Sequence, residues 1–152
     1  MSLKGLIGDL VSANHILFKE GVVDGFGHVS VREARDPERF LLSIFEIREA
    51  GGPATDMLIR DRKLGAALAR TLGAASFALM RGHGSVAVGG SLKQVVFRAI
   101  YAEANARLQS DAMKLGAVTF LNEHEAANTA AANDVNLDRP WELWKKRVSR
   151  PA

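Results

Sequence analysis

The sequence predicts a single α/β domain over its 152 residues. Apolar residues recur at the helical period near both ends of the chain, in residues 3–18 and 91–116. Between them, residues 28–32 alternate apolar and polar side chains as a half-buried strand does, and residues 77–80 and 85–88 form short apolar runs. With 47% apolar residues, the chain is long enough for one core and too short for two ordinary domains.

The first half of the chain predicts a helix followed by a hairpin. The apolar stripe of residues 3–18 gives an amphipathic helix that stops at Gly21. The strands of residues 28–32 and 39–43 flank the turn residues Asp36 and Pro37. Another strand-like segment, residues 44–48, follows Ser43 with no turn residue between them, so two strands are joined end to end.

The second half predicts four further helices and a second strand pair. A short helix around residues 64–72 is closed by Gly73, and two strands flank residues 81–84. The longest helix begins at Ser91, which forms a capping-box pair with Gln94, and runs to Gly116. An alanine-rich helix over residues 122–133 and a short terminal helix from Asp138 complete the chain.

Composition excludes several classes of protein. The chain has no cysteine, so a disulfide framework and a thiolate metal site are excluded, and any metal must use His, Asp or Glu. The sequence has no apolar stretch of membrane-spanning length, which predicts a cytoplasmic protein with no membrane partner. The net charge of +3 comes from interleaved charges except near Lys145, Lys146, Arg147 and Arg150, which predicts a solvated basic tail and no nucleic-acid partner.

Three stretches together resemble the class II aldolase/adducin family. They are residues 25–32 (Gly-Phe-Gly-His-Val-Ser-Val-Arg), residues 79–89 around Arg81-Gly82-His83-Gly84, and residues 99–109 of the long helix. The sequence of the first stretch, together with Pro140-Trp141-Glu142-Leu143-Trp144 near the end, most resembles those family members that decarboxylate hydroxylated aromatic or pyridine dicarboxylates. The resemblance covers nearly all of the chain.

The resemblance implies a fold and a chemistry. The fold is a mainly antiparallel sheet flanked by helices on both faces, in a homo-oligomer that is commonly a tetramer. The chemistry is carbon–carbon lyase activity, by aldol cleavage or decarboxylation, in which a divalent metal, zinc or manganese, stabilises an enolate. The substrate implied is a small-molecule carboxylate or a sugar phosphate.

The resemblance also implies an internal deletion between Ser43 and Ile44. Family members have several dozen residues at this point, which include interior strands, a glutamate and a His-x-His pair that bind the metal. No His-x-His occurs in this chain, and His83 is the one ligand position carried over. A catalytic zinc site generally needs three protein ligands, so the activity is predicted to be impaired. His83 has an alternative interpretation as a turn residue between two glycines.

A second group of candidate residues lies in the glycine loop before the first strand. The resemblance places Gly27, His28, Ser30 and Arg32 where family enzymes hold the substrate anion, and a histidine there would suit a carboxylate. The alternative for His28 is a residue that caps its own turn.

The remaining polar and aromatic candidates have ordinary structural interpretations. Surface positions are predicted for His15 and His124. Arg81, Glu103 and Asn105 are predicted to have surface roles, with a role in a pocket or an interface as the alternative. Packing roles are predicted for the aromatic side chains Tyr101, Trp141 and Trp144.

Two functions of different class stay open at this stage. One is a shortened metal-dependent lyase. The other is a non-catalytic remnant of the fold that serves as a structural or assembly module, as the adducin branch of the family illustrates.

Overall fold

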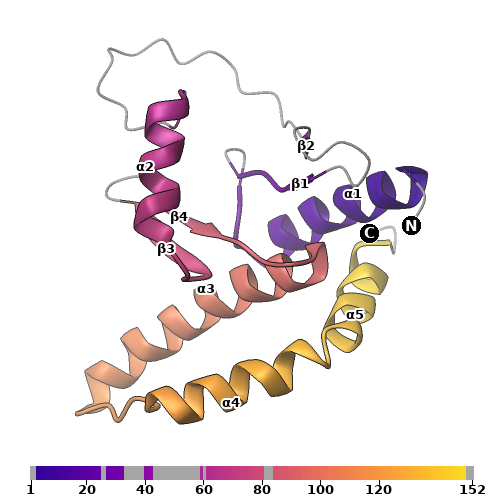
Figure 1. Ribbon diagram of the computed structural model, residues 1–152. Coiled ribbons are helices and arrows are strands. Elements are labelled where there is room, and N and C mark those ends of the chain that lie inside the picture. The colour runs from indigo at the N-terminus through magenta and orange to yellow at the C-terminus, as the bar shows by residue number, and fades with distance from the viewer. Residues whose placement is uncertain are drawn as a thin grey trace.

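A computed structural model describes residues 3–24, 27–32, 40–42, 59, 61–80 and 84–149 of the chain (Figure 1). The predicted strand over residues 44–48 lies outside these residues. The elements, in chain order, are α1 (Leu3–Lys19), β1 (Ser30–Arg32), β2 (Phe40–Leu42), α2 (Arg62–Leu72), β3 (Phe77–Met80), β4 (Gly84–Ala87), α3 (Leu92–Leu115), α4 (Glu123–Asp134) and α5 (Asp138–Ser149). Within the described ranges, no helix has the length and apolarity that a membrane crossing requires.

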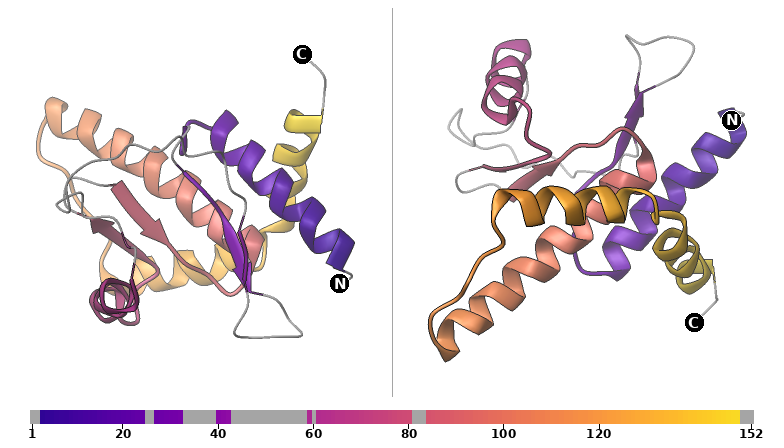
Figure 2. Two further views of the ribbon diagram at one scale, coloured as in Figure 1. Left: turned by 90° about the horizontal axis from the view of Figure 1, so that it is seen from above. Right: turned by 60° about the horizontal axis from the view of Figure 1, so that its bottom comes forward.

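The core lies where α1, the first half of α3 and α5 meet (Figures 1 and 2). Of the predicted apolar stripe of α1, Leu10 and Leu17 are buried, whereas Leu3, Ile7, Val11 and Phe18 are 43% to 61% exposed, because the buried face of the helix runs through Ala13 and Ile16 instead. The packing role predicted for the two tryptophans is confirmed, since Trp141 is 1% exposed and Trp144 is 6% exposed. The buried apolar side chains of the core are Leu10, Ala13, Ile16, Leu17, Val29, Val96, Ile100, Trp141 and Trp144.

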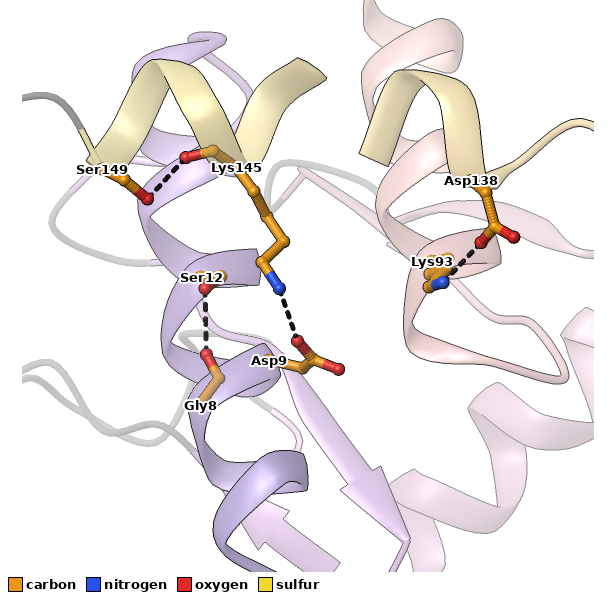
Figure 3. Close-up of polar contacts among 7 residues, drawn as sticks. All are labelled: Gly8, Asp9, Ser12, Lys93, Asp138, Lys145 and Ser149. Atoms are coloured by element: carbon orange, nitrogen blue, oxygen red, sulfur yellow. Dashed lines mark hydrogen bonds and ion pairs between the residues drawn. The ribbon is translucent and has the colours of Figure 1, made fainter. Parts of the chain in front are cut away.

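Ion pairs hold α5 against the other two helices of the core (Figure 3). Lys145 Nζ lies 3.1 Å from Asp9 Oδ1 on α1, and Lys93 of α3 pairs with Asp138 at the start of α5. The hydrogen bond to Asp138 raises the pKa of Lys93, and burial opposes that effect. The segment predicted as a solvated basic tail therefore differs from the prediction at Lys145, because this side chain has a carboxylate partner on α1.

A further pair completes this attachment at the other end of α5. Arg147 Nη1 lies 3.1 Å from Glu20 Oε1, and Lys19 Nζ donates to the Arg147 carbonyl at 2.9 Å. The cations of α5 thus act as links between the first and the last helix of the described chain.

The strands form antiparallel pairs, as predicted. In the first pair Ser30 lies opposite Leu42, and in the second Phe77 lies opposite Ala87. Across the described residues these pairs are two separate two-stranded sheets. The fold is therefore a helix-rich α/β arrangement, and one larger sheet with helices on both faces stays a prediction.

Helix ends follow the sequence signals with one correction. Ser91 caps α3, and its hydroxyl accepts from the Gln94 amide at 3.2 Å, as predicted. The Gln94 side chain, however, accepts from the Gly90 amide at 2.7 Å, so the predicted capping box is half formed. A complete capping box occurs instead between Asn122 and Glu125, at the start of α4.

The second half of α3 and the whole of α4 extend away from the core (Figures 1 and 2). They run in opposite directions and are joined at the end far from α1 and α5. No residue of α4 is buried, and Leu108 and Leu115 of α3 are 67% and 91% exposed. This part of the chain, residues 101–134, is called the open arm below.

Candidate functional site

The predicted anion loop is anchored against the end of α1. After Gly21, which has a φ of +72°, the amides of Val22 and Val23 donate to the Leu17 carbonyl at 2.9 and 3.3 Å. Both valines pack against the core. A Cβ on Gly27 would lie 2.2 Å from Cγ1 of Val23, so only glycine allows the backbone to pass this close.

The residues after Gly27 alternate between solvent and core. Val29 is 4% exposed and belongs to the core, whereas His28 and Ser30 on either side of it are exposed. The buried Val29 therefore directs the imidazole and the hydroxyl to the solvent side of the same short segment. The structure brings together two of the predicted anion contacts, in a position open to a small molecule.

Arg32 is placed only in part. Its backbone pairs with Phe40 in the first hairpin, and its side chain lies outside the description. The contact of the guanidinium with a substrate anion stays a prediction.

The predicted metal ligand His83 lies outside the described residues, with Arg81 and Gly82. The described strands on either side, β3 and β4, pair with Met80 opposite Gly84. The metal role of His83 and its alternative as a turn residue both stay open.

The other histidines lie where the sequence placed them. His15 is exposed on α1, and His124 is exposed in the first turn of α4, where its Nε2 lies 3.1 Å from Nδ2 of Asn128. Among the residues with described positions, no group of three or more His, Asp or Glu side chains is placed to hold a metal ion. The described donor set does not fit a divalent metal.

The remaining candidates on α3 differ from one another. Glu103 pairs with Arg107 one turn away, whereas Asn105 is exposed and lines a cleft beside α4. Tyr101 is 44% exposed, and its ring lies 4.4 Å from that of Phe97, so its packing role is partial.

A cleft of about 370 Å³ lies between α3, α4 and the start of β3. Arg98 and Asp134 line the cleft, and neither residue was among the site candidates predicted from the sequence. These two charged residues are 36 positions apart in the sequence, so no local periodicity predicts their proximity. They come together because α4 runs back along α3.

Comparison with known proteins supports the family resemblance. The sequence model described as "Class II Aldolase and Adducin N-terminal domain" matches residues 44–110, which include α2, β3, β4 and most of α3. The chain is also similar to "Decarboxylase tropJ" of Talaromyces stipitatus, at 39% identity over 112 residues. Over these residues the chain is similar to the class II aldolase and adducin family. Both the family resemblance and the decarboxylase-like relationship predicted from the sequence are confirmed.

The similarity to the decarboxylase extends over only part of each protein. The match to the decarboxylase covers 61% of the present chain and 42% of the relative, so the chain spans less than half of that protein's length. Class II aldolase family members generally use a divalent metal, and the described residues of this chain do not assemble a site for one.

Proposed function

We propose that this chain is an internally shortened, decarboxylase-like member of the class II aldolase and adducin family with impaired carbon–carbon lyase activity. The observation that carries the proposal is the donor set. The 152 residues contain four histidines and no His-x-His, and three of the four, His15, His28 and His124, are exposed side chains on separate elements. A lone imidazole at His83 cannot hold a divalent ion selectively against water.

The proposed shortening lies between Ser43 and Ile44, within one domain over residues 1–152. The exposed surface of the family-matched segment supports it. Helix α2 buries no residue, and Leu79 on β3 is 80% exposed. Unpaired strand edges and exposed apolar side chains are what removal of covering strands would leave behind.

The anion loop would retain its binding role in this proposal. His28 and Ser30 would donate hydrogen bonds to a carboxylate of a small hydroxylated aromatic or pyridine dicarboxylate, and Arg32 would supply a fixed positive charge. Such contacts orient a substrate, but they do not stabilise the negative charge of an enolate. The family's zinc or manganese would supply that stabilisation when bound.

The test is a decarboxylation assay on the full chain with added zinc or manganese and a panel of hydroxylated aromatic and pyridine dicarboxylates. We expect carbon dioxide release at the background rate, unchanged by His83→Ala, because the metal is too weakly held. A full-length decarboxylase of the family provides the positive control. Metal-dependent release that His83→Ala abolishes would contradict the proposed impairment and establish a working enzyme.

The second candidate function is a non-catalytic structural or assembly module, and the exposed open arm favours it. Leu108, Leu115 and Phe120 are each more than 60% exposed, which is apolar surface that an oligomer would cover. In this proposal the chain is a cytoplasmic homo-oligomer, a tetramer by family resemblance. Sedimentation analysis tests it, and a clean, reversible monomer at micromolar concentration would exclude it.

A further inference from the structure

The cleft between α3, α4 and the start of β3 has the size and lining of a small-molecule site. Its volume of about 370 Å³ falls in the range of ligand clefts, roughly 300–1,000 Å³. Three aromatic rings, those of Phe77, Phe97 and Tyr101, contribute to its walls. The last two pack on each other, tilted by 37° with their centroids 4.4 Å apart, and so form one continuous aromatic wall.

The polar end of the cleft presents a donor beside an acceptor. Arg98 is fixed by a 2.8 Å hydrogen bond from Nη1 to the Val88 carbonyl, and Asp134 Oδ1 accepts from Gln94 Nε2 at 2.8 Å. The other two atoms, Arg98 Nη2 and Asp134 Oδ2, are 3.9 Å apart. The two side chains therefore form a long ion pair without a direct hydrogen bond, and because they are 30% and 41% exposed, a ligand in the cleft can reach both.

We propose that this cleft binds an uncharged, planar aromatic amide. The ring would lie against the aromatic wall, the amide oxygen would accept from Arg98 Nη2, and the amide N–H would donate to Asp134 Oδ2. A carboxylate of the same shape lacks the N–H and would meet the charge of Asp134. The cleft therefore favours the amide over the acid, the opposite of the anion loop at His28 and Ser30.

The first test compares benzamide with benzoate by NMR titration of the full-length chain. We expect saturable benzamide binding with shifts in α3, α4 and β3, and at least about tenfold weaker binding of benzoate, as for one hydrogen bond to a charged group. Asp134→Asn should reduce this preference about tenfold. Asp111→Asn, which removes the same charge from an exposed pair with Lys114 on α3, should leave it unchanged.

A second pair of variants tests the location. Ala130 lines the cleft and its neighbour Ala131 does not, and both are exposed on α4, which buries no residue. Ala130→Phe should fill the cleft and abolish benzamide binding, whereas Ala131→Phe should bind as the parent does. This pair keeps the test decisive if Asp134→Asn fails to fold.

Three results would overturn the proposal: no saturable benzamide binding, equal affinity for benzamide and benzoate, or unchanged binding in Ala130→Phe. None of these measurements involves turnover or metal. The proposed amide site and the proposed lyase function are therefore tested independently of each other.

Discussion

The packed end of the molecule and the open arm use the same long helix in different ways. Up to Ile100, α3 packs between α1 and α5 and buries Val96 completely. Beyond Tyr101 the same helix has no buried residue, and α4 beside it has none either. The first half of α3, which buries Val96 and Ile100 against α1 and α5, lies within the family-matched residues 44–110, whereas α2 in the same matched segment buries no residue.

Within the family-matched segment, the first half of α3 contributes to the core, whereas α2 buries no residue. The first and last helices hold the described structure together through the two tryptophans and the ion pairs of α5. The family-matched strands and α2 add little buried surface. A segment that carries a family's sequence pattern without its packing partners fits the proposed internal deletion.

The largest difference between the packed end and the open arm is expected when one large side chain in each region is replaced by alanine. Trp141→Ala should destabilise the chain by about 3–5 kcal/mol, because it removes the largest fully buried side chain. Leu115→Ala, at a residue that is 91% exposed, should change stability by no more than about 0.5 kcal/mol. Urea unfolding followed by circular dichroism measures both, and equal losses would show that the open arm is packed after all.

Substitution of two glycines by alanine tests how closely the loop at Gly27 is packed against the end of α1. Gly27→Ala should cost about 1–3 kcal/mol, since its new Cβ would meet the short, β-branched side chain of Val23. The control is Gly8→Ala in α1, where nothing lies within 4 Å of the new Cβ and helix propensity should add about 0.5–1 kcal/mol of stability. Thermal unfolding compares them, and a neutral Gly27→Ala would refute the close approach.

The smallest effect concerns the ion pairs. The Lys145–Asp9 pair is partly buried, with side chains 32% and 25% exposed, and we expect a coupling of about 0.5–1 kcal/mol. The pair Lys114–Asp111 on the open arm is 70% and 72% exposed, and its coupling should be near zero. Double-mutant cycles measure each coupling directly. A stronger coupling on the arm than at α5 would reverse the comparison.

Local patterns predicted the elements better than the contacts between them. The stripe of α1, the stop at Gly73 and the burial of the tryptophans follow from short-range periodicity and residue type. The link from Lys145 to Asp9 spans 136 positions and leaves no local trace, which is why these cations were predicted to be solvated. The strand predicted from His28 begins two residues later, at Ser30, because its pairing with β2 begins there, opposite Leu42 at the end of β2.

The candidate site was predictable to the same extent. Alternation around Val29 placed His28 and Ser30 together on the exposed side, whereas the roles of Arg32 and His83 depend on the family resemblance. The cleft at Arg98 and Asp134 was not predictable, since it arises from the return of α4 along α3.

Metal binding by the purified chain tests the central claim most directly. After incubation with excess zinc or manganese and exhaustive dialysis, elemental analysis should find far less than one ion per chain, with no difference between the parent and His83→Ala. One tightly held ion per chain, lost in His83→Ala and retained in His28→Ala, would show that His83 has other ligands and would contradict the account.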